Sequence, residues 1–227
     1  MSFNYKGVTE KEIVEQESVW GSVSSEFLNK DSVVYDIGAY RGVTARGFAE
    51  IGAEVHAFEG SKKNHDYLIE NTKDLKNIMC YNVALNTSNY KTKTKFNDCI
   101  NQENLLQEIT YVRLDDFVSS NKIKDPNLIK MDIEGMESVV MLTCERFIAD
   151  VKPIWLLSLH ENFPGFGLDY PGWVASEQGG YRFDNLFEYY KVYDGNLNEM
   201  NELSGSPMEC LAEFLLIPRN LIILSRS

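Results

Sequence analysis

The sequence predicts an α/β fold in which a mostly parallel sheet carries helices on both faces. Short β-rich apolar runs alternate with segments of helical periodicity, which is the pattern of βαβ units with right-handed crossovers. The chain has 227 residues, of which 44% are hydrophobic and 25% charged, so it can bury one large core without disulfides or metals. We therefore expect a single domain over residues 1–227.

The first two thirds of the chain supply the repeating elements. Residues 1–30 are expected to form a helical segment, since Thr9 and Glu12 make a capping box ahead of apolar residues at helical spacing. Strands are expected where short apolar runs end in turn residues, at 32–37, 54–58, 78–83, 128–132 and 154–159. Helices are expected between them at 43–51, 62–72 and 136–144. A polar region through 101–108 precedes residues 111–117, which alternate weakly.

The last third is less regular. Residues 162–180 are rich in glycine, proline and aromatic residues, which favours a long loop that contacts the substrate. A helix is expected at 183–190 and a strand at 191–194, followed by apolar runs at 213–217 and 221–224 on either side of Pro218. The sheet is therefore expected to end in antiparallel strands.

Charge and composition exclude several classes of function. The formal net charge of −12 repels phosphate polymers, so nucleic acids and anionic membrane surfaces are poor partners, whereas neutral or cationic small molecules and glycans fit. The four cysteines form no CxxC pair and predict free thiols. The N-terminus lacks the apolar core of a signal peptide, and no apolar stretch is long enough to span a bilayer, so a cytoplasmic location is expected.

The most informative motif, D-x-G-x-x-x-G, follows the first predicted strand at residues 36–42. Gly38 suits a tight turn, and Gly42 allows the following helix and a ligand to approach closely. A dinucleotide fingerprint would have a glycine where Asp36 stands, and a carboxylate there disfavours a pyrophosphate. The same carboxylate suits a ligand with an ammonium group and a sulfonium, so the motif favours S-adenosylmethionine over NAD.

Glu59 ends the second predicted strand 23 residues after Asp36. In this type of fold, an acidic residue at that position accepts hydrogen bonds from a ribose diol. The pair of acidic residues, together with the two glycines, therefore predicts a nucleoside ligand.

Four segments resemble the FkbM family of class I S-adenosylmethionine-dependent methyltransferases: VVYDIGAYRG, VHAFEGS, VALN at 83–86 and LIKMDIEGMES at 128–138. The resemblance covers about residues 30–160, and K-x-D-x-E-G-x-E is its most specific part. It implies a Rossmann-like fold with a seven-stranded sheet and a reversed last strand. It also implies a cofactor lying over the carboxyl ends of the strands, and O-methyl transfer to small molecules, often glycosides.

The resemblance also assigns roles to individual residues. Asp36, Gly38 and Gly42 would line the methionine part of the cofactor, Glu59 the ribose, and residues 82–84 the surroundings of adenine. Asp132 would lie at the catalytic mouth. The residues expected to bind the cofactor are Asp36, Gly38, Ala39, Tyr40, Gly42, Glu59, Gly60, Ser61, Asn82, Val83 and Ala84.

Methyl transfer to a hydroxyl also needs a base, and His160 is the best candidate among the three histidines. It ends the fifth predicted strand, at the edge of the sheet where ligands bind, and Asp132 could orient it from the adjacent strand. His56 lies in an apolar strand and is expected to be a satisfied, half-buried residue. His65 lies in a polar helix.

A divalent cation such as Mg²⁺ is an alternative means of activating the hydroxyl. Asp132, His160 and Glu161, with Glu134, offer suitable ligand types. Glu134 and Glu137 could instead bind the backbone or cap a helix.

Aromatic residues directly after His160 could form a wall against a sugar ring, or could pack as ordinary core. They are Phe163, Phe166, Tyr170 and Trp173, with Glu161, Asp169 and Glu177 as polar partners for substrate hydroxyls. The function expected is O-methylation of a sugar or glycoside. A methyltransferase acting on a non-sugar small molecule or peptide, and a non-catalytic cofactor-binding module, are the alternatives, and a nucleotide-dependent oxidoreductase is a weaker one.

Overall fold

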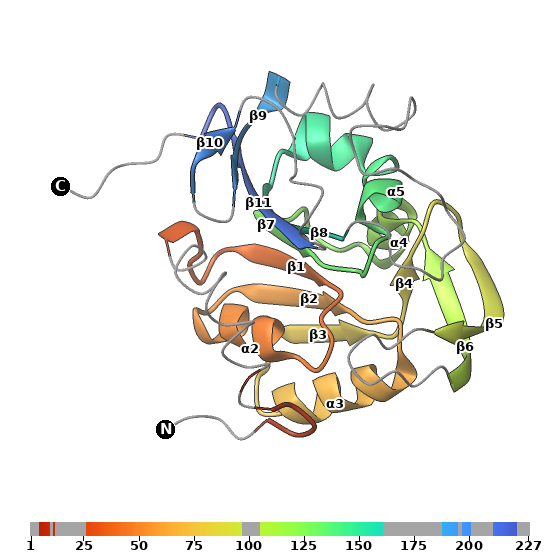
Figure 1. The fold of residues 1–227 in the computed structure, drawn as a ribbon. Helices are drawn as coiled ribbons and strands as arrows, with labels where there is room; N and C mark the ends of the chain where they lie inside the picture. The colour runs from red at the N-terminus through yellow and green to blue at the C-terminus, as the bar shows by residue number, and fades with distance from the viewer. Residues whose placement is uncertain are drawn as a thin grey trace.

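The computed structural model describes residues 5–9, 11, 26–96, 105–160, 188–194, 197–200 and 211–221 (Figure 1). The elements run in the order β1 (Val33–Ile37), α2 (Val43–Glu50), β2 (Glu54–Phe58), α3 (Lys62–Thr72), β3 (Ile78–Tyr81), β4 (Ala84–Leu85), β5 (Tyr90–Phe96), β6 (Leu105–Val112), α4 (Leu114–Asn121), β7 (Leu128–Met131), α5 (Glu137–Met141), the π-helical turn η1 (Phe147–Val151), β8 (Ile154–His160), β9 (Tyr190–Asp194), β10 (Glu199–Met200) and β11 (Leu211–Pro218).

The main sheet has the strand order β10-β9-β11-β8-β7-β1-β2-β3 in the described residues. Five neighbouring strands of this sheet, β3, β2, β1, β7 and β8, pair in parallel. In contrast, β11 runs antiparallel to both of its neighbours, β8 and β9. The mostly parallel sheet with a reversed last strand is therefore confirmed. The two-residue strand β10 extends the expected seven strands at one edge.

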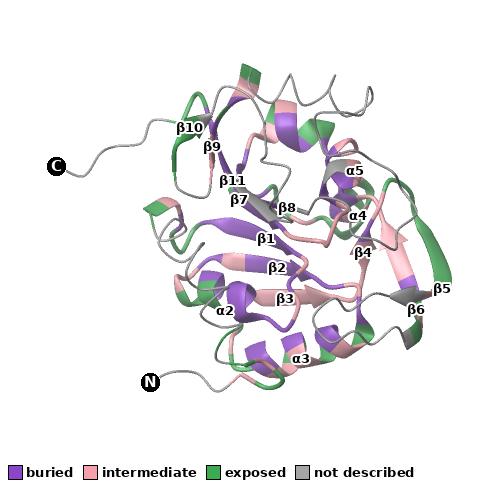
Figure 2. Cartoon of the chain, in the orientation of Figure 1, coloured by how far each residue is buried: buried purple, intermediate pink, exposed green. Residues whose placement is uncertain are grey.

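Two apolar cores lie on opposite faces of this sheet, because successive side chains of a strand point to opposite sides. Val33, Tyr35 and Ile37 of β1 belong to the core that also contains residues of α4, α5 and η1. Val34 of the same strand belongs to the core that contains residues of α2 and α3. Figure 2 shows β1 buried along its whole length, which is why its sequence is continuously apolar up to Asp36.

The prediction is best for β1–α2–β2–α3, where the bounds of β2 and α3 match those expected. A small second sheet, β4-β6-β5, was not predicted. The strand β5 has the sequence YKTKTKF and lies at an edge, where alternate lysines replace the apolar signature of a buried strand. Figure 2 shows it exposed along most of its length.

Other expectations needed correction. Residues 111–117 divide between the end of β6 and the start of α4, and the helix expected at 136–144 is limited to α5. Tyr190, expected in a helix, begins β9, and the strand before Pro218 is the single long β11. Most of the N-terminal segment 1–30 and the whole substrate loop 162–180 lie outside the described residues. In the part that is described, no helix is both long and apolar enough to cross a membrane.

Candidate functional site

The D-x-G-x-x-x-G segment forms a turn that is folded against the carboxyl end of β2. The backbone N–H groups of Gly38 and Ala39 both donate to the carbonyl of Phe58 at 3.0 Å, and the N–H of Gly42 donates to the carbonyl of Ala39 at 2.9 Å. Gly38, Tyr40 and Gly42 have positive φ angles of 78°, 49° and 91°. The turn therefore uses its own N–H groups to hold its shape.

The two glycines are required by their neighbours as well as by their backbone angles. A Cβ atom on Gly38 would lie 1.8 Å from the carbonyl oxygen of Asp132, at the end of β7. A Cβ atom on Gly42 would lie 2.9 Å from Cδ1 of Leu68 in α3. Gly42 thus makes room for α3 rather than for the helix that follows it. The turn is packed directly between the ends of β7 and α3.

Glu59 joins this turn to the loop after β2. Its Oε2 accepts a hydrogen bond from the backbone N–H of Tyr40 at 2.9 Å, and its Oε1 accepts one from that of Ser61 at 2.7 Å. The side chain of Asn82 donates to the carbonyls of Glu59 and Gly60 at 2.9 and 3.2 Å. A carboxylate oxygen can accept two hydrogen bonds, so these anchors are compatible with a ribose contact, which stays a prediction.

Asp36 lies deeper than the sequence suggested. It is fully buried, and its Oδ2 accepts a hydrogen bond from the hydroxyl of Thr44 at 2.6 Å. Its Oδ1 lies 3.3 Å from Nζ of Lys130, a residue that pairs with Asp36 in the register of β1 and β7. The carboxylate therefore already has a cationic partner within the protein. The sequence predicts a carboxylate open to the positive groups of a ligand, whereas in the structure it is paired with Lys130. Its contact with a cofactor stays a prediction.

Lys130 was not among the predicted site residues. Nζ of Lys130 also donates to the carbonyl of Gly38 at 2.8 Å and lies 3.9 Å from Oδ2 of Asp132. Burial by itself lowers the pKa of Lys130, but the charges of Asp36 and Asp132 outweigh it, so the pKa is raised and the amine is charged. One signal was present in the sequence: Lys130 and Asp132 are two residues apart in a strand, a spacing that places both on one face.

The loop after β7 is held by a second buried carboxylate. Glu137, which is 1% exposed, accepts hydrogen bonds from the backbone N–H groups of Ile133 and Gly135 at 2.7 and 3.0 Å. The turn between them has positive φ angles at Glu134 and Gly135. The alternative that Glu137 binds the backbone is thus confirmed. Asp132, at the start of this turn, keeps 36% of its side chain exposed.

The structure brings most of the predicted cofactor residues together. Hydrogen bonds of Glu59 and Asn82 link the turn at 36–42 to residues 59–61. Val83 packs against the core that contains Tyr35, and Ala84 begins the second sheet by pairing with Tyr111. Their predicted place near adenine remains a prediction.

Most of the predicted catalytic and substrate residues have side chains outside the described part of the structure. The backbone of His160 ends β8 and pairs with Leu211 of β11, but its side chain lies outside the described part. The same holds for the predicted substrate residues Glu161, Phe163, Phe166, Tyr170 and Trp173. No group of three metal-binding side chains occurs in the part of the chain that is described, so the set Asp132, His160 and Glu161 remains untested.

The prediction that His56 is satisfied is confirmed, but the residue is buried, at 4% exposed, rather than half-buried. Its Nδ1 lies 3.0 Å from the hydroxyl of Tyr81, and its Nε2 lies 3.2 Å from Oε1 of Glu54. Burial is the largest influence and lowers the pKa of His56, although Glu54 acts in the opposite direction. The imidazole is therefore neutral at pH 7.

A polar groove of about 510 Å³ contains none of the predicted site residues. It is lined by Arg113, Asp115, Leu142, Thr143, Glu145, Arg146, Ala149 and Asp150. These residues belong to α4, η1 and the segments beside them, rather than to the turn at 36–42.

The sequence that forms this site matches a known protein family. A family model described as the methyltransferase FkbM domain matches residues 36–183. That range contains the turn, Glu59 and the loop after β7. No functionally curated protein matches the sequence.

Solved structures share the fold at low sequence identity. The methyltransferase FkbM from Methylobacillus flagellatus superposes with a TM-score of 0.53 at 15% identity, over 83% of this chain and 44% of that chain. The chain thus spans less than half of that relative. A fibrillarin/Nop5p complex gives a TM-score of 0.53 at 13% identity, over 96% of this chain and 90% of that one. A SAM-dependent methyltransferase from Agrobacterium tumefaciens gives 0.51 at 13% identity, over 93% and 63%.

Proposed function

The chain belongs to the FkbM methyltransferase family, and on that basis we propose that it transfers the methyl group of S-adenosylmethionine to a hydroxyl oxygen of a sugar or glycoside. The choice of S-adenosylmethionine as cofactor rests on one observation: backbone N–H groups of the turn at 36–42 already donate hydrogen bonds within the protein. The N–H groups of Gly38 and Ala39 bind Phe58, and that of Tyr40 binds Glu59. A pyrophosphate needs such N–H groups as donors, so the turn disfavours NAD.

The charges at this edge also favour S-adenosylmethionine. Asp36, Glu59 and Asp132 supply three carboxylates near the ammonium group of Lys130. The guanidinium of Arg41 in the turn instead donates to Asn64 and to the carbonyl of Gly7. The surplus negative charge suits a ligand whose sulfonium and ammonium groups outweigh its carboxylate. The residues present therefore fit this cofactor, with Glu59 beside the ribose and the turn at 36–42 beside the methionine part.

The protein's own work in the reaction is to orient the acceptor and to remove its proton. The cofactor, when bound, supplies a methyl group that is already activated by its positive sulfur. In our proposal the acceptor oxygen bonds to this methyl as the S–C bond breaks, and His160 takes the hydroxyl proton. Asp132, at the end of β7, orients or stabilises the protonated imidazole.

The substrate half of the proposal rests on sequence. Aromatic residues after His160 would stack on the apolar face of a sugar, with Glu161 binding a hydroxyl. The net charge of −12 supports a small-molecule or glycan acceptor over a nucleic acid. A divalent cation such as Mg²⁺ held by Asp132, His160 and Glu161 is the alternative way of activating the acceptor.

The cofactor is tested by calorimetric titration with S-adenosylhomocysteine and, separately, with NAD. We expect micromolar binding of the first and none of the second. Glu59→Gln should weaken the binding of S-adenosylhomocysteine about tenfold or more, because it replaces the charged carboxylate that anchors the turn with a neutral amide. Glu70→Gln is the matched control, since Glu70 pairs only with Lys6 and Lys73 among the ion pairs described on α3. Binding of NAD alone would overturn the proposal.

The reaction is tested by screening glycosides, non-sugar alcohols and peptides for methyl transfer, with Mg²⁺ and with a chelator. Turnover of a glycoside that His160→Ala abolishes, while S-adenosylhomocysteine still binds, supports the proposal. Turnover of a peptide or non-sugar molecule alone would replace the substrate class. Binding without turnover of any class would favour a non-catalytic module.

A further inference from the structure

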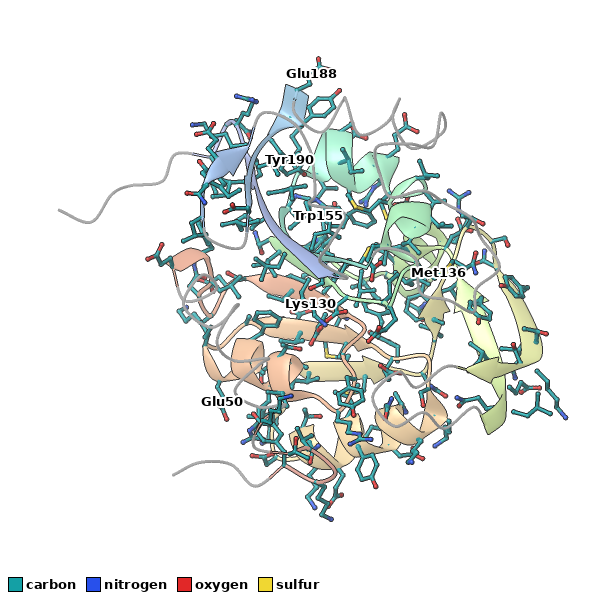
Figure 3. All side chains as sticks on the ribbon, viewed as in Figure 1. Glu50, Lys130, Met136, Trp155, Glu188 and Tyr190 are labelled. Atoms are coloured by element: carbon teal, nitrogen blue, oxygen red, sulfur yellow. The ribbon has the colours of Figure 1, made fainter. Side chains whose placement is uncertain are left out.

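Lys130 lies between the cofactor turn at 36–42 and the loop after β7, which begins at Asp132. Figure 3 shows it in the interior of the molecule, whereas Glu50 and Glu188 lie at the periphery. Its side chain is 5% exposed, and its ammonium group lies within 4 Å of an oxygen atom of each of Asp36, Gly38 and Asp132. The first two residues belong to the cofactor turn, and the third begins the loop at the proposed catalytic mouth.

The backbones that follow β1 and β7 are in close contact at the same point. The backbone N–H of Asp132 donates to the carbonyl of Ile37 at 3.0 Å, and Gly38 leaves no room for a side chain against the carbonyl of Asp132. The backbone is thus already joined at this point. Lys130 adds the side-chain link, since it binds the Gly38 carbonyl on one side and faces the Asp132 carboxylate on the other.

We propose that Lys130 is a positioning residue of the methyltransferase site, whose ammonium group fixes the cofactor turn at Gly38 relative to the carboxylate of Asp132. This inference rests on the proposed function, and it assigns the lysine of the K-x-D-x-E-G-x-E motif a role toward the cofactor. It differs from a simpler role in which Lys130 only neutralises the buried Asp36. The two roles predict different behaviour once Asp36 is made neutral.

The decisive comparison is between Asp36→Asn and the double variant Asp36→Asn/Lys130→Met. In Asp36→Asn the lysine still binds Gly38 and Asp132, so the affinity of this variant for S-adenosylhomocysteine is the reference against which the double variant is compared. In the double variant the link is lost, and we expect a further loss of about tenfold or more, the size of one charge-assisted hydrogen bond. Equal affinity of the two variants, both folded by circular dichroism, would overturn the proposal.

Lys130→Met alone tests whether the ammonium group is the cation of this site. The carboxylate of Asp36 would then keep the hydroxyl of Thr44 as its hydrogen-bond partner, and the other charged groups that act on Lys130, Glu59 and Asp132, are also carboxylates. Removing one partner of a buried pair is costly, so we expect Tm to fall by about 10 °C at pH 8. The double variant, which removes both charges, should recover most of that loss.

The same variant should acquire a pH dependence. An ionised carboxylate that is buried without a cation is costly, and binding a proton removes that cost, so the stability of this variant should be retained at low pH and lost as pH rises. The gap in Tm between Lys130→Met and the double variant should therefore widen from pH 5.5 to pH 8.5. A constant gap would contradict the charged pair of Lys130 and Asp36, whereas the affinity comparison above decides the proposed link between Gly38 and Asp132.

Lys124→Met is the matched control, because Lys124 is an exposed lysine that pairs with Glu54. It should leave S-adenosylhomocysteine affinity unchanged. The outcome is separable from that of the proposed function. Failure of the wild type to bind S-adenosylhomocysteine would remove the proposed function, whereas wild-type binding with no difference between the two Asp36 variants would remove only this inference.

Discussion

The two ends of the parallel strands use charged side chains in different ways. At the carboxyl end, Glu59 and Glu137 are buried and accept hydrogen bonds from backbone N–H groups of the loops. At the amino end, Glu54 binds the side chains of Lys124 and His56 and remains partly exposed. The first arrangement fixes the course of the backbone, whereas the second joins side chains at the surface.

The difference indicates where stability and function are linked. A carboxylate that accepts hydrogen bonds from two N–H groups of a loop restrains the course of its backbone. An exposed pair such as Lys124 and Glu54 contributes little, because water and salt screen it. Substitutions at the carboxyl end should therefore change both stability and cofactor binding, and those at the amino end should change stability alone.

The largest effect is expected for Gly38→Ala. The added Cβ would meet the Asp132 carbonyl at 1.8 Å, and the residue would have to keep a φ of 78°, so we expect a loss of about 3–5 kcal/mol in the free energy of unfolding. Urea denaturation measures it. Gly47→Ala is the control, since no described atom lies within 4 Å of the added Cβ in α2, and it should be neutral or stabilising. Equal stability of the two variants would contradict the packing described for the turn.

An intermediate effect is expected for Glu137→Ala. It leaves the N–H groups of Ile133 and Gly135 without their charged acceptor, which should cost about 2–3 kcal/mol and weaken S-adenosylhomocysteine binding. Denaturation and calorimetry on one preparation measure both. Glu188→Ala, at an exposed position, is the matched control. A stability loss without any change in affinity would show that the loop after β7 does not contribute to the cofactor site.

The smallest effect should come from His56, which lies in the middle of β2 and contacts Glu54 at the amino end of that strand. Burial lowers its pKa in the folded state, so its contribution to stability is present above its unfolded pKa and is lost as pH falls. The Tm of the wild type should therefore decrease more between pH 7.5 and pH 5.5 than that of His56→Gln, with cofactor affinity unchanged. Parallel Tm curves for the two proteins would contradict it.

Sequence patterns were most informative for elements whose own hydrophobic pattern also matches the face that they bury in the fold. The bounds of β2 and α3 were predicted because an apolar run and a helical period specify them directly. The small sheet of β4, β5 and β6 was missed because an edge strand such as β5 has no buried face to mark it. The helix expected at 136–144 ends at Met141, where the N–H groups of Thr143 and Cys144 turn back to the carbonyls of Val140 and Met141.

The sequence by itself determined the fold class, the family and the position of the glycine turn, because these follow from apolar periodicity and from residues close together in the chain. Only the tertiary structure decided that Asp36 is paired with Lys130 and that Gly38 is required by the carbonyl of Asp132. Those contacts join residues more than 90 positions apart, and they exist only because β1 and β7 lie side by side in the sheet.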